Sequence, residues 1–227
     1  TAATKSGRLL MIGHVLPFFP EYDWALSTIR SGKYGRLRGG AFRRVISNPA
    51  WLENYWSAEQ VGGPMLDLHV HDAHFIRLAF GMPTEITTVG RTHDGLPEFW
   101  HTQFRFADKD LIAEATSGTI DQPGRPFTHA YEIQLERATL AFDFAVFGSE
   151  GRYQCDPVLF DNDGGIERPS FPSTDPIDAF VSELREVMQS IKSGRTSDIL
   201  GAELAQDAIL LCEKQAESLA LRKPVCL

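Results

Sequence analysis

The feature that most constrains the fold of this chain is a succession of strand-like segments joined by short turns in its middle. The segments are rich in β-branched and aromatic residues, and the turns read DGLP, DKD, DQPGRP, ER and GSEG. Short turns between consecutive strands pair those strands antiparallel. The predicted strands are residues 85–91, 99–107, 111–120, 128–135, 138–145 and 152–160.

Alternation along residues 99–106 predicts a sheet with two different faces, because successive side chains of a strand point to opposite sides. Phe99, His101 and Gln103 share one face, and the set on the other face is Trp100, Thr102, Phe104 and Phe106. We expect one face to be covered by helices and the other to be available for a partner.

The rest of the chain reads mainly as helices. Helical spacing or helix-end signals occur at residues 21–30, 65–80, 177–193 and 197–219, with Asp175 as a predicted N-cap. The apolar run at residues 9–15 resembles a buried strand, residues 36–47 have strand character, and Trp51 and Trp56 fall in an expected short helical piece. The predicted fold class is α+β, an open, mainly antiparallel β-sheet with helices on one face.

Composition excludes several classes of partner. A formal charge of −8 argues against nucleic acid or an anionic membrane, since both require clustered Lys and Arg. The three cysteines are odd in number and lack CxxC spacing, and no run approaches a membrane span. We therefore expect a cytoplasmic protein with no membrane partner, no nucleic-acid partner and no thiolate metal site.

The chemistry-bearing stretch is GGPMLDLHVHDAHFIRLAFG, residues 62–81, which holds three of the seven histidines. At about 100° per residue, Asp67, His71 and His74 form one polar stripe on an otherwise apolar helix. Unpaired burial of such groups is costly, so the stripe should line a cleft. We expect His69 to be a core histidine paired with Asp72.

Other interpretations of this stripe remain open. Asp67 and His71 have the i, i+4 spacing of a buried ion pair that braces the helix. Asp67, His71 and His74 also make a carboxylate and two imidazoles, the ligand types of a divalent metal site, which would predict a metal-dependent hydrolase or isomerase. A complete structural site would want a fourth ligand, and neither His14 nor His93 is an assured donor.

Gly62-Gly63 followed by Asp67-x-x-x-His71 resembles the glycine-rich turn and helix of the Gfo/Idh/MocA family of nicotinamide-dependent oxidoreductases. His74 stands where that family often has Asp. The resemblance covers nearly the whole chain, but only the family's C-terminal half, whose fold is like the C-terminal domain of glyceraldehyde-3-phosphate dehydrogenase. It implies that residues 1–15 are the remnant of an absent Rossmann domain and that residues 16–227 bind substrate and form oligomers.

The resemblance implies a dehydrogenase that oxidises a hydroxyl of a sugar, cyclitol or related polyol. His71 would be the catalytic base and Asp67 its partner, while Gly62 and Gly63 would approach the cofactor. The substrate-binding candidates are His14, His74, Arg43 and Trp56.

The same resemblance implies that NAD or NADP is bound mainly by a domain absent from this chain, since the sequence lacks G-x-G-x-x-G and E-K-P. It also implies a homo-oligomer built through the open sheet face. The competing class is a non-catalytic ligand-binding or assembly module.

Overall fold

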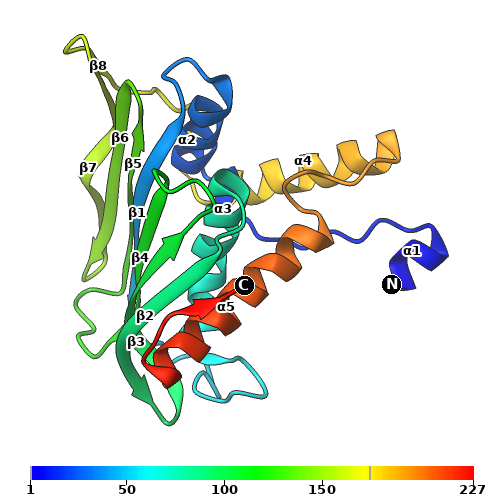
Figure 1. Cartoon of the computed structure of the whole chain (residues 1–227), viewed down its shortest axis with the longest axis vertical. Coiled ribbons are helices and arrows are strands. Elements are labelled where there is room, and N and C mark those ends of the chain that lie inside the picture. Colours follow the sequence, from blue (N-terminus) through cyan, green and yellow to red (C-terminus); the bar gives the residue numbers. More distant parts are fainter. Residues whose placement is uncertain (1, 174) are drawn as a thin grey trace.

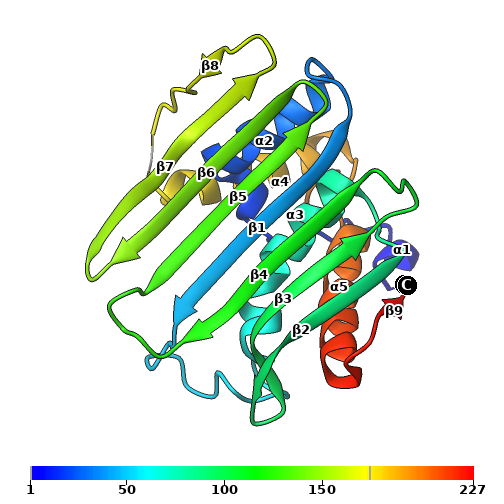
Figure 2. The ribbon, with the colours of Figure 1, turned by 60° about the vertical axis from the view of Figure 1, so that its left-hand side comes forward.

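The computed structural model describes residues 2–173 and 175–227 and has an α+β fold. Its described residues form a nine-stranded sheet in the order β8-β7-β6-β5-β1-β4-β3-β2-β9. Figure 1 shows helices on one side of this sheet only, and Figure 2 shows the uncovered side, which we call the open face. The predicted fold class, an open and mainly antiparallel sheet with helices on one face, is confirmed.

The strands follow the alternating segments of the sequence closely. Adjacent strands pair antiparallel except β1 and β4, which run parallel at the centre of the sheet. The chain leaves β1, passes through a helix and the β2–β3 hairpin, and returns as β4. The strands are β1 Leu37–Ser47, β2 Glu85–His93, β3 Leu96–Arg105, β4 Ile112–Ile120, β5 Phe127–Leu135, β6 Ala138–Phe147, β7 Glu150–Asp161, β8 Ile166–Glu167 and β9 Val225–Cys226.

The helices begin and end at the residues that their caps favour. The carboxylate of Asp175 accepts a hydrogen bond from the backbone N–H of Ile177 at 2.9 Å, as predicted for the start of α4. Gly194 ends α4 with a φ of 67°, in the left-handed region where glycine is favoured. The helices are α1 Ala2–Ser6, η1 Leu16–Phe18, α2 Pro20–Ser31, η2 Met65–His69, α3 Val70–Phe80, α4 Ile177–Ser193 and α5 Ala202–Leu221.

The main core fills the space between the sheet and helices α2, α3 and α5. The predicted alternation of β3 is confirmed, because Trp100 and Phe104 are 1% exposed and belong to this core. Tyr22 of α2 and Phe75 of α3 are fully buried against it. The covered face of the sheet is therefore the one that packs helix α3 and its histidines.

Two local predictions are wrong. Residues 9–15 do not form a buried strand: within the described chain they make one isolated bridge, from Met11 to Gly201, and Leu10 is 47% exposed. An apolar run becomes a strand only where a neighbouring strand satisfies its backbone. Residues 50–56 are turns instead of a helical piece, and Asn54 has a φ of 58° that a helix does not accommodate.

Helix α4 differs from the other long helices because its apolar side is uncovered. Figure 1 shows α4 extending away from the sheet, on the same side as the segment that follows α1. The exposed apolar residues of α4 are Ile177, Phe180, Leu184, Met188 and Ile191, which are 50% to 65% exposed. We call this set the α4 stripe.

Candidate functional site

A wide helical turn leads into the candidate site. Residues Met65–His69 form a π-helical segment, η2, that continues directly into α3. π-helical turns are rare and occur frequently at functional sites. The preceding Gly62 and Gly63 have φ values of 84° and 65°, so the turn into the helix requires glycine at both positions.

Three histidines meet at this helix, and we call them the histidine cluster: His14, His71 and His74. The Nδ1 atoms of His14 and His74 lie 2.7 Å apart, a buried hydrogen bond between residues far apart in the sequence. The His14 ring also lies 5.9 Å from the His71 ring, centroid to centroid. The structure therefore brings together three of the residues that were predicted to bind or act on substrate.

Burial disfavours the protonated form of all three histidines in the cluster. It lowers the pKa of His71 to about 4 and that of His74 to about 3, and it also lowers the pKa of His14. The charge of Arg44 lowers the pKa of His71 further, while Asp72 opposes that effect. Nδ1 of His71 and Nε2 of His74 are buried without a hydrogen-bond partner among the described residues.

A buried ion pair lies on the sheet side of α3. The Nε and Nη2 atoms of Arg44, on β1, donate to the Asp72 carboxylate at 2.5 and 3.2 Å. His69 is a core histidine as predicted, but its predicted pairing with Asp72 is wrong, because Nδ1 of His69 bonds to Oγ of Ser117 at 2.8 Å. Asp72 instead forms its ion pair with Arg44, since a fully buried carboxylate needs a charged partner.

The predicted partner of His71 is not beside it. Asp67 is exposed and makes no hydrogen bond to His71 or His74 among the described contacts. Asp67 lies within the π-helical segment, whose wider turn changes the angle between residues four apart. Partial burial still raises the pKa of Asp67.

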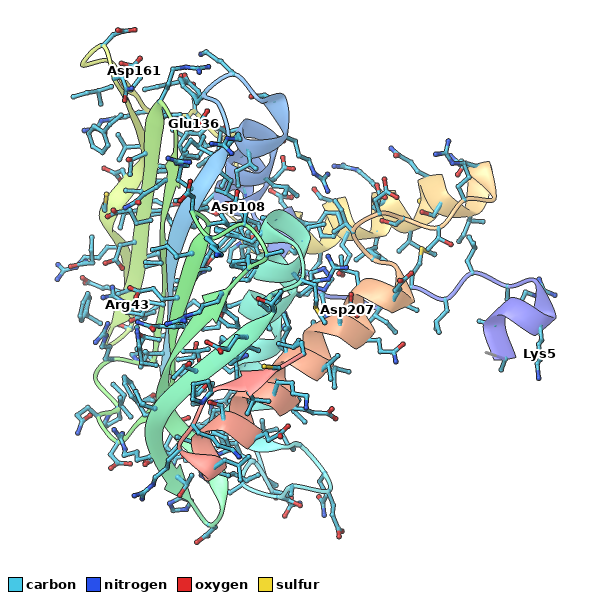
Figure 3. The ribbon with its side chains drawn as sticks, in the orientation of Figure 1. Lys5, Arg43, Asp108, Glu136, Asp161 and Asp207 are labelled. Atoms are coloured by element: carbon cyan, nitrogen blue, oxygen red, sulfur yellow. The ribbon has the colours of Figure 1, made fainter. Side chains whose placement is uncertain are left out.

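Two other predicted substrate residues lie elsewhere. Arg43 points to the open face and donates to Asp143 at 2.7 Å, so the structure separates it from the histidine cluster; Figure 3 labels it on that side. Successive strand residues point to opposite faces, and Arg44 takes the helix side. Trp56 packs on His93, with ring centroids 4.5 Å apart, beside a furrow lined by residues 48–57.

Sequence reasoning missed one carboxylate near the histidine cluster. Glu183 of α4 lies against Gly13: a Cβ built on that glycine would be 3.5 Å from both carboxylate oxygens. Oε1 of Glu183 is buried without a partner among the described residues, and burial raises the Glu183 pKa. No signal in the sequence marks it, because its neighbours follow an ordinary helical pattern.

The alternative prediction of a divalent metal site requires a cluster of ligand side chains. In residues 2–173 and 175–227, no three His, Cys, Asp or Glu side chains are arranged to hold a metal ion. Asp67 in particular is directed to solvent while His71 and His74 are buried or half-buried. The predicted set of Asp67, His71 and His74 is therefore not assembled as a ligand set.

The described residues do not form a dinucleotide cradle. Such a cradle follows a parallel βαβ unit, and the one parallel pair among the described strands, β1 and β4, lies at the centre of the antiparallel sheet. The predicted cofactor contacts, Gly62 and Gly63, are buried; a Cβ on either would meet Leu66 or Leu96. The turn that they form, with a positive φ at both residues, explains why glycine is required there.

This fold and motif define a class of protein, and comparison with known proteins identifies the family. The model of the GFO/IDH/MocA C-terminal domain matches residues 22–154. The chain belongs to this family, which confirms the resemblance noted in the sequence. No curated protein matches the chain by sequence. No helix among the described residues has both the length and the apolar character needed to cross a membrane.

Solved structures share the fold. Levoglucosan dehydrogenase in complex with NADH and L-sorbose has a TM-score of 0.77 and 16% identity, covering 99% of this chain and 68% of its own. UDP-N-acetylglucosamine 3-dehydrogenase from Acidithiobacillus ferrooxidans has a TM-score of 0.70 and 14% identity, covering 96% and 64%. An oxidoreductase from Desulfitobacterium hafniense, described as NADPH-dependent, has a TM-score of 0.78 and 16% identity, covering 99% and 66%. The chain thus spans about two thirds of the length of these relatives.

Proposed function

We propose that this chain is the substrate-binding part of a nicotinamide-dependent dehydrogenase that oxidises a hydroxyl of a sugar, cyclitol or related polyol. The observation that carries the proposal is the neutral, largely buried His71 at the start of α3, in contact distance of a second imidazole and within the family's motif. Relatives of the same fold are named as sugar dehydrogenases, which supports this substrate class.

The proposed role of His71 is that of a base. A hydride leaves an alcohol carbon readily only when the O–H proton departs as well, so the site needs a nearby proton acceptor. A histidine with a pKa of about 4 is neutral at physiological pH and holds a free lone pair. In this proposal His14 and His74 line the same site as His71. Asp67, which is exposed, belongs to the side of that site that faces solvent.

The cofactor, NAD or NADP, is proposed to bind mainly to a nucleotide-binding domain outside this chain. The cofactor would accept the hydride, while His71 would take up the proton of the substrate hydroxyl. Supporting this, the α4 stripe and the neighbouring Leu10 and Ile12 expose apolar surface that another domain would cover. We propose that residues 1–15 connect to that domain and that residues 16–227 form the substrate domain.

We also propose self-association through the open face, in a cytoplasmic enzyme. Trp100 and Phe104 of β3 face the helices and contribute nothing to the open face. The support for this proposal is the exposure of Val89 and Ile112, at 61% and 62%, on the open face. The cytoplasmic location is supported by the three free cysteines, Cys155, Cys212 and Cys226.

Kinetics of the full-length enzyme test the assignment. Replacing His71 with Ala should lower turnover of a polyol substrate by about a hundredfold or more, the scale of a general base. His101→Ala, on the open face, is the matched control and should leave turnover unchanged. Near-normal turnover in His71→Ala, with the fold retained by circular dichroism, would exclude the dehydrogenase role of this site.

One observation favours a second candidate, a non-catalytic ligand-binding or assembly module. Asp67 and His71, the acid and base of the family motif, do not contact each other in this structure. A module of this kind would bind polyols without turnover in the full-length protein. Calorimetric binding of a polyol with no NAD(P)-dependent oxidation would favour it.

A further inference from the structure

His14 and His74 are joined by a hydrogen bond whose direction follows from their surroundings. A neutral imidazole carries one N–H and one lone pair. The two Nδ1 atoms lie 2.7 Å apart, so one Nδ1 donates and the other accepts. Burial disfavours the protonated form of both rings, so neither ring carries a proton on both nitrogens. The group that meets the other nitrogen, Nε2, therefore decides which ring donates.

The backbone of Ile199 decides the tautomer of His74. Burial is the main effect on the His74 pKa and lowers it, whereas the Ile199 backbone favours a proton on the ring. A carbonyl oxygen acts in this way, and a backbone N–H would act in the opposite way. Because Nδ1 of His74 is engaged by His14, the carbonyl bears on the buried Nε2. A lone pair there would face the carbonyl oxygen without a proton between them, which is costly for buried groups. His74 therefore carries its proton on Nε2 and accepts at Nδ1.

The segment that carries Ile199 is held against the segment that carries His14. Oγ of Ser197 accepts hydrogen bonds from the backbone N–H groups of Ile199 and Leu200, both at 3.1 Å. The carbonyl oxygen of Leu200 accepts from the N–H of Ile12, two residues before His14, at 2.9 Å. The hydrogen bond between the two imidazoles thus belongs to a frame of backbone contacts that fixes both of its sides.

This direction leaves His14 with its lone pair on Nε2. Since Nδ1 of His14 donates to His74, Nε2 of His14 is unprotonated and can only accept. It has no hydrogen-bond partner among the described residues and, unlike Nε2 of His74, it is not closed off from solvent. The His71 ring lies 5.9 Å from the His14 ring, centroid to centroid, and its Nε2 is open in the same way. A free acceptor therefore stands beside the proposed base.

We propose that His14 determines substrate specificity: its Nε2 accepts a hydrogen bond from a hydroxyl group next to the one that His71 deprotonates. His74 is a positioning residue, which holds His14 in the Nδ1–H tautomer. The inference rests on the proposed function of His71 and narrows the substrate class to polyols with two neighbouring hydroxyl groups. An analogue that lacks the second hydroxyl would leave Nε2 of His14 without a donor, and such a site discriminates against it.

Nuclear magnetic resonance of the ¹⁵N-labelled protein tests the two tautomers without an enzyme assay or a variant. Correlations between the ring nitrogens and the carbon-bound ring protons distinguish a protonated nitrogen from a bare one. At pH 7 we expect the proton of His14 on Nδ1 and that of His74 on Nε2. The reverse assignment, with His14 protonated at Nε2, would overturn the proposal whatever the protein catalyses.

Kinetics of the full-length enzyme test the role of His14. The probes are the best polyol substrate of the wild type and its analogues that lack one hydroxyl next to the reacting carbon. The wild type should prefer the polyol in kcat/KM by about tenfold, the scale of one hydrogen bond. His14→Ala should remove this preference mainly by raising the KM of the polyol, whereas His101→Ala, on the open face, should keep it. If His71→Ala is inactive but His14→Ala keeps the preference, the proposal is wrong and the function stands. If His71→Ala stays active, both are wrong.

Two variants of His74 test its positioning role. His74→Leu removes the acceptor of the His14 N–H, so it should weaken the preference for the polyol and shift the His14 proton from Nδ1 toward Nε2. His74→Asn places an amide oxygen where Nδ1 stood and should restore both the preference and the tautomer. An unchanged His14 tautomer in folded His74→Leu would overturn the positioning role.

Discussion

Arg43 and Arg44 are neighbours on β1 and experience opposite environments. Arg44 is 5% exposed and pairs with the fully buried Asp72 under helix α3. Arg43 faces the open side and pairs with Asp143, with side chains 41% and 25% exposed. The same two chemical groups thus form one ion pair inside the protein and one at its surface.

The difference teaches where this fold concentrates its chemistry. A surface pair is screened by water and contributes little, whereas a buried charge that loses its partner is strongly destabilising. The buried pair sits directly beside His71 and acts on its pKa. The covered face of the sheet therefore holds both the candidate site and the ion pair whose disruption would destabilise the protein strongly. The ion pair on the open face contributes little to stability.

The largest expected effect comes from breaking the buried pair. Asp72→Ala leaves the Arg44 charge buried and alone, and should lower the free energy of unfolding by about 3–5 kcal/mol. The matched variant Asp143→Ala, on the open face, should cost at most about 1 kcal/mol. Urea denaturation of both variants measures the two values. Equal losses of unfolding free energy in the two variants would contradict the difference between the covered and the open face.

Two adjacent glycines of β1 allow the same comparison of the two sheet faces, here through side-chain packing. A Cβ on Gly40, which faces the helices, would lie 2.6 Å from the ring of Phe80. Gly40→Ala should therefore cost about 1–3 kcal/mol by overpacking. A Cβ on Gly39 would meet its nearest atom, the Ile112 carbonyl oxygen, at 3.2 Å. The expected loss for Gly39→Ala is smaller, and denaturation midpoints that rank the two variants the other way would contradict this assignment of faces.

Acid should destabilise the covered face through its histidines. Their folded pKa values are depressed, so the unfolded chain binds more protons, and stability present above pH 6.5 is lost as pH falls toward about 4. We expect Tm to fall by several degrees between pH 7 and pH 5, measured by calorimetry. His74→Gln should flatten this dependence, whereas His101→Gln should not. A Tm independent of pH in this range would mean that the histidines are not held neutral.

The smallest effect on stability is expected on the open face. Ile112 is 62% exposed, so Ile112→Lys should stay within about 0.5 kcal/mol of the wild type. If the open face mediates self-association, the same change should shift the protein toward monomer in analytical ultracentrifugation. An unchanged oligomer would place the interface elsewhere, and a large loss of stability would mean that this face is not free.

Local patterns predicted most of the sheet, because alternation and short turns depend on neighbouring residues. They failed where the outcome depends on distant parts of the chain. An apolar run at residues 9–15 does not say whether a strand will pair with it. Period-two alternation separates Arg43 from Arg44 without saying which one faces the helix.

The candidate site was predicted in part for the same reason. The α-helical spacing brought His71 and His74 together correctly, since both lie in α3 and meet His14. It could not reveal the π-helical segment that holds Asp67, nor a carboxylate delivered by α4 from more than a hundred residues away. Such contacts depend on tertiary packing, which sequence spacing does not encode.

The central claim is that the covered face holds His71 as a neutral base. Its most direct test is a ¹⁵N titration of the His71 ring in the folded chain, compared with the ring of His101 on the open face, whose side chain is 39% exposed. The account predicts that His71 remains neutral at pH 5.5 and takes up a proton only near pH 4. A His71 ring that titrates at its ordinary pKa of 6.5 would contradict it.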